Sequence, residues 1–176
     1  MSATPQTSVP DGTWTGDNVH STLSFEVPYA VNTFKGEVPD FNVTLADGVL
    51  SGSARIESLK LKEEHLQGHL QSPEFFDAER HPELTFTSTA IRRNGDSIEI
   101  DGDLTIKGIT VAATLKGTIT GPAVDHFGAT RVGLELRTVV DRTTFDMNWN
   151  MPLPSGEPAL SNDVTLTADL SLVQQA

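Results

Sequence analysis

Short stretches of alternating polar and apolar residues run along most of this chain of 176 residues and constrain its fold more than any other feature. Residues 22–27 (TLSFEV) are an example, because a period of two is typical of a strand with one buried face. The pair Asp47–Gly48 separates two such stretches, as in a tight hairpin. Residues 94–96 and 107–108 predict further turns. About eight or more short strands with regularly spaced turns favour an antiparallel barrel or a sandwich.

The alternation also assigns a face to each strand residue. Leu23, Phe25 and Val27 share one face of their strand, and the same spacing adds Tyr29. In a closed eight-stranded barrel such a face points inward, where side chains either fill the interior or enclose one small ligand. Gly102 leaves inward volume unfilled, and only 6% of the residues are aromatic. The pattern alone does not separate a filled barrel from a hollow one.

One segment, residues 60–78, breaks the alternation. Leu66 and Leu70 are four positions apart, which places them on one face of a short amphipathic helix that a proline ends or extends into a further turn. Two adjacent aromatic residues, Phe75 and Phe76, follow. We expect this segment to be a plug or lid on the barrel, with one of the two rings in the core and the other on the wall of a ligand site.

The longest irregular stretch is residues 147–160, which carries Trp149, Met151 and Leu153 among three prolines. Long loops with apolar side chains of their own are often lids or portals. The alternative, a loop folded back onto the core, is equally compatible with the sequence.

Composition excludes several classes of function. The formal net charge of −12 disfavours binding to nucleic acid or to anionic lipid surfaces. The absence of cysteine excludes disulfides, thiolate metal sites and a cysteine nucleophile. No apolar run is long enough for an integral membrane segment.

The length predicts a single domain. We expect residues 1–12 to be a flexible N-terminal tail and residues 13–176 to be one barrel domain. The polar N-terminus lacks the pattern of a secretory signal, so we expect a cytoplasmic protein, or a periplasmic one if the natural start was replaced.

The histidines suggest little chemistry. His65 and His69 have the i,i+4 spacing of two zinc ligands, but no third ligand is evident, so we expect no metal and no cofactor. His20 and Ser21 are neighbours in an extended segment and point to opposite faces, which excludes them as a base and its nucleophile. Neither a nucleophile elbow nor a phosphate loop is present.

Several motifs together resemble one family. The chain resembles the YceI-like, polyisoprenoid-binding proteins from Gly12 to Val173. The residues that carry the resemblance are WTGDNVHSTLSF from Trp14, HLQSPEFFDAERHPELTF from His69, GDLTIKGIT from Gly102, RTTF from Arg142, NWN from Asn148 and NDV from Asn162. The resemblance implies an elongated, lipocalin-like antiparallel barrel closed by a helix. It also implies an interior tunnel for a long isoprenoid, quinone-like or fatty amphiphile, and no catalytic activity.

The chain departs from the family pattern at three places. An Arg-His pair is replaced by Pro28-Tyr29, an Arg-Asp pair by Leu66-Gln67, and an Asp-Phe-Gly stretch by Thr144-Phe145-Asp146. A pyrophosphate head needs charge-assisted donors, so these losses favour a neutral head, to which Tyr29 and Gln67 would hydrogen-bond. Arg142 is either a buried arginine paired with a carboxylate or an anchor for the head.

We therefore predict an all-β, elongated antiparallel barrel of about eight strands, closed by one short helical segment, that carries a long apolar amphiphile without catalysis. The predicted ligand-binding residues are Phe25, Val27, Tyr29, Gln67, His69, Phe75, Phe76, Phe86, Leu104, Arg142, Phe145 and Trp149. One alternative is a stress-related interaction protein with a packed barrel. A second is an enzyme acting on a lipid, with His69 and either Glu74 or Asp77 as the acid–base pair. A homodimer through a strand edge or the Trp149 loop is compatible with the sequence.

Overall fold

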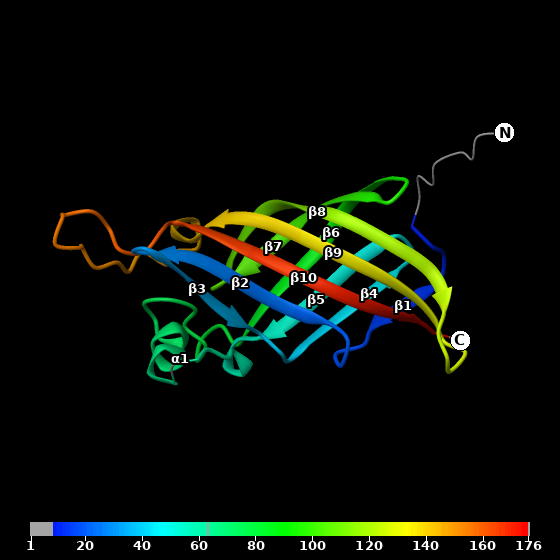
Figure 1. Cartoon of the computed structure of the whole chain (residues 1–176), viewed down its shortest axis with the longest axis horizontal. Coiled ribbons are helices and arrows are strands. Elements are labelled where there is room, and N and C mark those ends of the chain that lie inside the picture. The colour runs from blue at the N-terminus through cyan, green and yellow to red at the C-terminus, as the bar shows by residue number, and fades with distance from the viewer. Residues whose placement is uncertain (1–8, 63, 176) are drawn as a thin grey trace.

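A computed structural model describes residues 9–62 and 64–175 of the chain. Ten strands, one α-helix and two short 3₁₀ helices follow one another along it (Figure 1). Their bounds are β1 (Thr13–Gly16), β2 (Thr22–Tyr29), β3 (Asn32–Glu37), β4 (Phe41–Ala46), β5 (Val49–Arg55), η1 (Ile56–Ser58), α1 (Glu64–Gln71), β6 (Glu83–Asn94), β7 (Ser97–Ile106), β8 (Ile109–Val124), β9 (Thr130–Asp141), η2 (Arg142–Phe145) and β10 (Asp163–Gln174). The prediction of an all-β protein with one short helix is confirmed.

Eight of these strands form a closed antiparallel ring in the order β1-β4-β5-β6-β7-β8-β9-β10, and β1 closes it by pairing with β10. β1 is short, and it pairs with β10 only from Trp14 to Gly16. Further along β10, its partner is β2, which carries β3 as a hairpin. The predicted eight-stranded barrel is therefore present, with an additional hairpin at one end.

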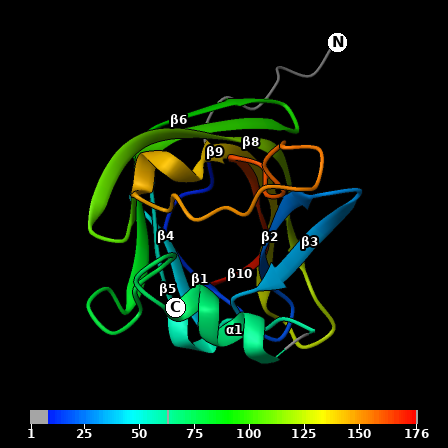
Figure 2. The ribbon, with the colours of Figure 1, turned by 90° about the vertical axis from the view of Figure 1, so that its left-hand side faces the viewer.

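The barrel has a closed end and an open end. The two ends of the chain, at β1 and β10, lie at the closed end, whereas α1 and the loop between η2 and β10 lie at the open end (Figure 1). There the outer edge of β3 meets no strand but forms an isolated bridge between Glu37 and Lys60. Viewed from this end, α1 lies across the interval between β3 and β5 (Figure 2). The helix thus replaces a missing part of the barrel wall.

A second interval in the wall lies between β8 and β9. Their pairing ends at Lys116 and Arg137, so residues 109–115 of β8 and 138–141 of β9 are not paired with each other. A hollow of about 360 Å³ lies along this interval. The ring is therefore fully hydrogen-bonded only toward its closed end.

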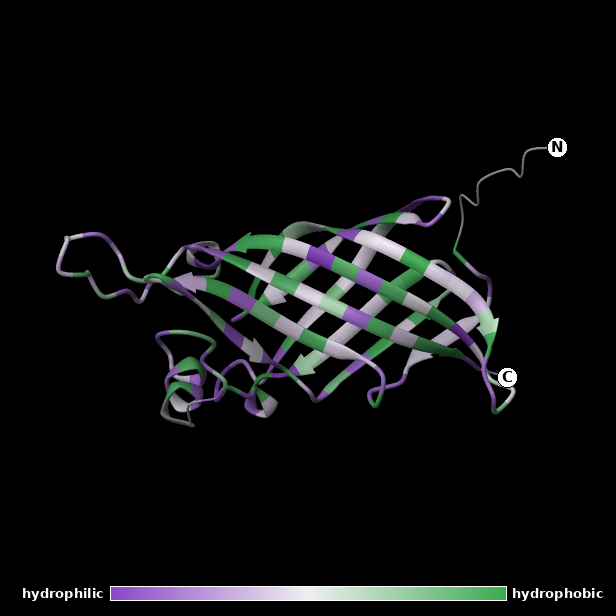
Figure 3. Ribbon diagram, in the orientation of Figure 1, coloured by the Kyte–Doolittle hydropathy of each residue, from purple (hydrophilic) through white to green (hydrophobic). Residues whose placement is uncertain are grey.

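Tight turns connect the strands where the sequence predicts them. Asp47 and Gly48 both have positive φ, as do Lys107 and Gly108, which is the conformation of a two-residue hairpin turn. Hydrophobic and hydrophilic residues alternate along the strands, as the period-two pattern of the sequence predicts (Figure 3).

The closed half of the barrel is packed with side chains. Across the described residues, the largest side chains that are at most 2% exposed are Trp14, Leu45, Ile56, Leu59, Ile98, Ile100, Ile119, Val132, Leu134, Leu136, Phe145 and Leu172. All but Ile56, Leu59 and Phe145 project from strands of the ring, and the Trp14 indole nitrogen donates a hydrogen bond to the Asp11 carbonyl oxygen (3.0 Å). Val9 packs partly against the same core. Residues 1–8 of the predicted flexible tail, residues 1–12, lie outside the described residues, so its flexibility stays a prediction.

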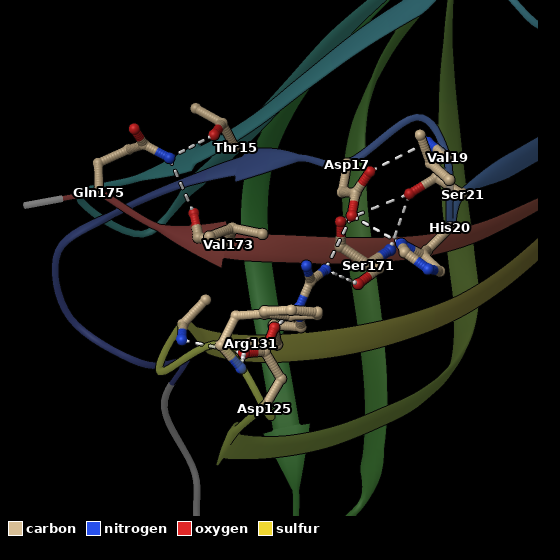
Figure 4. A network of polar contacts seen from close by, with 12 residues as sticks. Thr15, Asp17, Val19, His20, Ser21, Asp125, Arg131, Ser171, Val173 and Gln175 are labelled. Carbon is tan, nitrogen blue, oxygen red and sulfur yellow. Dashed lines mark hydrogen bonds and ion pairs between the residues drawn. The ribbon is translucent and has the colours of Figure 1, made fainter.

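A polar network ties the segments of the closed end together (Figure 4). Arg131 of β9 donates to Asp125 in the β8–β9 turn (2.6 Å), to Asp17 after β1 (2.9 Å) and to Ser171 of β10 (3.1 Å). Asp17 also contacts the His20 ring nitrogen at 2.7 Å. The hydrogen bonds from His20 first, and then from Arg131, lower the pKa of Asp17 from 3.8 to about 2.

Arg142 of η2 holds the long loop at the open end. Its guanidinium donates to the backbone carbonyls of Ser161 (2.9 Å), Met147 (2.6 Å) and Trp149 (2.8 Å), and more weakly to that of Leu160 (3.4 Å). Among the described residues no carboxylate lies within ion-pair distance of it, so its partners are carbonyls. The loop is thereby fixed at both of its ends.

The loop between η2 and β10 is also paired with β2. Tyr29 and Leu160 form a bridge, and the Ala30 amide donates to the Ala159 carbonyl (2.8 Å). Within the loop, Pro152 and Pro158 form a second bridge. The segment is therefore a short hairpin that extends the barrel beyond β2.

No helix in the described part of the chain is both long enough and apolar enough to cross a membrane.

Replacing Asp17 should flatten the dependence of stability on acid. In the unfolded chain Asp17 takes up its proton near pH 3.8, and in the folded protein only near pH 2. The stabilisation by the ionised carboxylate is therefore complete above pH 3.8 and is lost as the pH falls toward 2. Asp17→Asn should lower the free energy of unfolding by about 0.5–1.5 kcal/mol at neutral pH and should lose less of it on acidification. Urea unfolding between pH 7 and pH 2 measures this, with Asp103→Asn on the outer face of β7 as the control; equal acid slopes for all three proteins would contradict it.

Replacing Arg142 should loosen the open end. Arg142→Met leaves the carbonyls of Ser161, Met147 and Trp149 without this donor, whereas the Leu160 carbonyl keeps the Asn150 amide (2.7 Å). We expect the free energy of unfolding to fall by about 2–4 kcal/mol. Arg142→Lys should recover only part of this loss, because an ammonium cannot reproduce the planar fork. Urea unfolding measures the effect, and Arg137→Met, on the exposed face of β9, is the matched control. Similar stability of the two methionine variants would show that the carbonyl contacts contribute little.

Candidate ligand-binding site

A chamber of about 430 Å³ occupies the open half of the barrel. Its walls are the inward faces of β2, β9 and β10, and α1 with the turn that follows it closes one side. The side chains that line it are mostly aliphatic or aromatic: Leu23, Phe25, Val27, Phe34, Val38, Leu66, Leu70, Phe75, Phe76, Leu84, Ile106, Val140, Phe145, Met147, Trp149, Leu160, Val164 and Leu166. Such a chamber can take up an apolar molecule.

A smaller chamber of about 110 Å³ lies deeper in the barrel. Leu23 of β2, Leu84 of β6 and Leu166 of β10 line both chambers. These three side chains form the boundary between them, which we call the leucine neck. Phe86 and Leu104 line only the inner chamber. The two hollows therefore follow one another from the open end toward the middle of the barrel.

An aromatic cluster joins α1 to the loop at the outer end of the larger chamber. The His69 ring contacts Phe75 and Trp149 edge-to-face, with both centroid distances at 4.9 Å. Phe75 and Trp149 are 5.7 Å apart. The His69 Nε2 atom also contacts the Glu74 carboxylate at 2.6 Å. His69 thus links the helix to the opposite rim, and we refer to these rings as the mouth.

A lysine fixes the same two parts from outside. Lys107, in the β7–β8 turn, donates to the Pro73 carbonyl after α1 (2.6 Å) and to the Asp146 carbonyl after η2 (2.8 Å). Because both contacts come from one ammonium group, the helix and the loop are held at a defined separation.

Polar side chains are few in the larger chamber and include Ser24, Tyr29, His69 and Arg142. Tyr29 is 41% exposed at the tip of β2, whereas Arg142 is 4% exposed. Burial lowers the pKa of Arg142 below its ordinary value, and the charge of neighbouring Asp141 partly opposes this. The chamber therefore offers an apolar interior with a small number of polar groups.

Most of the residues that the sequence singles out meet here. Nine line the larger chamber: Phe25, Val27, Tyr29, His69, Phe75, Phe76, Arg142, Phe145 and Trp149. Phe86 and Leu104 line the inner one. Gln67 lines neither, because its side-chain oxygen accepts a hydrogen bond from the Leu61 amide (3.1 Å). Their contact with a ligand stays a prediction.

Two local expectations differ from the structure. Phe75 and Phe76 both line the chamber instead of dividing between core and wall, since they lie in a turn where side chains do not alternate as in a strand. The inward space at Gly102 is not left open, because the Phe86 ring lies over it and a side chain at this position would collide with that ring.

Sequence reasoning missed several wall residues. Phe34 faces the chamber because it pairs with Val27 across the β2–β3 hairpin. Val164 and Leu166 belong to an alternating stretch that the sequence shows, so the period-two signal was available for them. Leu160 and Met147 come from the irregular loop, where no periodic signal exists.

Metal binding and acid–base chemistry both depend on how the His, Asp and Glu side chains around the chamber are placed. Within residues 9–62 and 64–175, no group of three or more His, Asp or Glu side chains could hold a metal ion. Asp77 lies in the turn after α1, where its carboxylate is 3.8 Å from Arg80. The sequence suggests two acid–base pairs, His69 with Glu74 and His69 with Asp77. Among the described residues, only the first pair is in direct contact.

Comparisons with known proteins agree with this architecture. The family model described as the YceI-like domain matches residues 14–172. Proteins named YceI from Escherichia coli O157:H7 and from Salmonella arizonae are each 34% identical over 107 residues, which is 61% of this chain and 53% of theirs. The chain thus matches about half the length of these curated relatives.

Solved structures share the fold. BcnA from Burkholderia cenocepacia has a TM-score of 0.75 at 20% identity, covering 89% of this chain and 98% of its own. A YCEI protein from Campylobacter jejuni has a TM-score of 0.72 at 22% identity, covering 83% and 88%. A polyisoprenoid-binding domain from Saccharophagus degradans has a TM-score of 0.73 at 10% identity, covering 94% and 100%. With this barrel and a family match across most of its length, the chain belongs to the YceI-like family.

Proposed function

We propose that this protein is a non-enzymatic carrier that takes up the apolar chain of a single amphiphile into its barrel. The chain would occupy the chamber, and its polar head would remain at the mouth between α1 and the loop. The observation that carries the proposal is the 430 Å³ chamber with its mostly apolar wall.

Size and chemistry both support a small-molecule site. Pockets for small ligands typically have volumes of about 300–1,000 Å³ and combine apolar walls with a few polar groups. Burial of apolar surface contributes about 25 cal/mol per Å², so a long hydrocarbon chain gains free energy along its whole length. The name of the Saccharophagus degradans relative, a polyisoprenoid-binding domain, supports an isoprenoid or similar chain as the ligand class.

The polar groups favour a neutral head. Arg142 already donates to four carbonyls, which leaves little capacity for a phosphate. Tyr29 and the Trp149 indole are better placed as donors, because both line the chamber and neither side chain makes a hydrogen bond to another described residue. A quinone or alcohol oxygen would accept from either group.

The two rival functions have less support. A solidly packed barrel fits only the closed half of the molecule, since the open half holds the chamber. An enzyme would need an acid–base pair directed at the ligand, whereas Glu74 is 57% exposed and His69 is enclosed between two rings. The carrier proposal therefore accounts for more of the geometry.

Filling the chamber with a bulky side chain should abolish binding. Val140 lines the chamber, and its neighbour Val139 is 59% exposed on the same strand. Val140→Trp should weaken the binding of farnesol at least about ten-fold by occupying the space of the chain, whereas Val139→Trp should bind as the unmodified protein does. Native mass spectrometry and displacement of a fluorescent fatty probe measure the binding.

Two outcomes would contradict the carrier proposal. One is that the unmodified protein binds neither farnesol nor the longer alcohol geranylgeraniol. The other is equal binding by the two tryptophan variants, which would locate the ligand outside the chamber. Thermal unfolding of both variants checks that Val140→Trp is folded.

A further inference from the structure

We propose that the barrel measures the length of its ligand, and that it buries a chain of about 15–20 carbons and no more. This inference rests on the carrier function proposed above and adds the length class of the ligand. It follows from where the hollow ends, how it narrows and how much it can hold.

The hollow ends at the middle of the barrel. Beyond the inner chamber the interior is filled by side chains that are at most 2% exposed, among them Trp14, Ile98, Ile119 and Leu172. None of these four lines either chamber. A chain that enters at the mouth therefore meets packed side chains before it reaches the closed end.

Phe86 narrows the inner chamber, which Leu50 and Leu170 border toward the closed end. It projects from β6 and covers Gly102 on the adjacent strand β7, where a side chain would collide with its ring. The glycine allows a large aromatic ring to lie flat against the wall instead of leaving a gap. Removing this ring would enlarge the hollow, because Gly102 has no side chain to occupy the space that the ring leaves.

The leucine neck separates the inner chamber from the larger one. Leu23, Leu84 and Leu166 come from three different strands and border both hollows. A chain must pass between these side chains to reach Phe86.

The volumes set the capacity. A small group such as a methylene or a water takes about 30 Å³ in a liquid. The larger chamber of about 430 Å³ then holds about 14 carbons, and the inner one of about 110 Å³ holds about four more. A three-unit isoprenoid alcohol would fill the first chamber, and a four-unit one would fill both.

The interval between β8 and β9 is the other possible route for a longer chain. The hollow there shares Val140 and Phe145 with the larger chamber. Its other lining residues include Thr114, Asp141 and Thr144, so an apolar tail gains less there than in the inner chamber. We therefore infer that the tail ends in the inner chamber beside Phe86 and does not leave through the wall.

The test compares three alcohols with the same head, namely farnesol, geranylgeraniol and solanesol, of about 15, 20 and 45 carbons. Each buried methylene adds up to about four-fold in affinity, which ordering costs reduce. We expect the protein to bind geranylgeraniol at least about ten-fold more tightly than farnesol, and solanesol no more tightly than geranylgeraniol. Displacement of a fluorescent fatty probe followed by native mass spectrometry gives the three dissociation constants.

Two variants should move the limit in opposite directions. Leu166→Phe narrows the neck, and we expect the preference for geranylgeraniol over farnesol to fall to about two-fold or less. Phe86→Ala deepens the inner chamber, and we expect a straight-chain alcohol about four carbons longer to become the best ligand. The matched controls are Thr165→Phe, the neighbour of Leu166 on the opposite face of β10, and Phe127→Ala, a ring that is 94% exposed at the closed end.

The outcomes separate this inference from the carrier function. Tighter binding of solanesol than of geranylgeraniol, or an unchanged length preference in both variants, would overturn the length limit while the carrier function stands. No binding of any of the three alcohols would overturn both. If Phe86→Ala does not fold, the Leu166→Phe and Thr165→Phe pair decides the question alone.

Discussion

The hollow in this barrel follows from the shortness of one strand. Of the described strands, β1 alone joins the two ends of the eight-stranded ring, and it gives only three residue pairs to β10. After Gly16, β2 takes its place beside β10 and carries β3 with it, so the outer edge of β3 pairs with no further strand of the ring. A fully paired ring of eight strands has an interior that side chains can fill. The missing wall at the open end, which α1 supplies, makes room for the chamber.

The two ends of the barrel are fixed by different kinds of contact. At the closed end Arg131 bonds to the carboxylates of Asp17 and Asp125, whose pKa values the contacts lower. At the mouth, Arg142 and Lys107 donate to backbone carbonyls, which do not titrate. Acid therefore weakens the carboxylate contacts of Arg131, whereas the carbonyl contacts of Arg142 and Lys107 have no acceptor that acid can protonate in this range. Because Arg142 and Lys107 bond to main-chain carbonyls near the mouth, their contacts do not depend on which side chains the neighbouring residues carry.

The sequence predicts what depends on local chemistry and misses what depends on register. Asp47–Gly48 and Lys107–Gly108 need a positive φ, so their hairpins are visible in the sequence. The Gly121–Pro122 pair indicates the end of a strand, but β8 continues to Val124 through an irregularity in its pairing with β9. The wall position of Phe34 and the ring of Phe86 over Gly102 arise from cross-strand neighbours, which periodicity does not specify. Gln67 lies on α1 near the chamber, but its side-chain oxygen accepts a hydrogen bond from the Leu61 backbone amide.

The size of the chamber links binding to stability. Cavities left dry in a core cost about 24 cal/mol per Å³, so an empty, dry hollow of 430 Å³ would cost about 10 kcal/mol. This is the whole stability of an ordinary domain. A chamber of this size is therefore costly to leave empty, and either water that enters at the mouth or the chain of a ligand would offset that cost. Water gains little beside apolar walls, and a hydrocarbon chain restores the missing contacts. In the proposed carrier function, the packed half around Trp14 would keep the barrel folded while the open half takes up and releases its ligand.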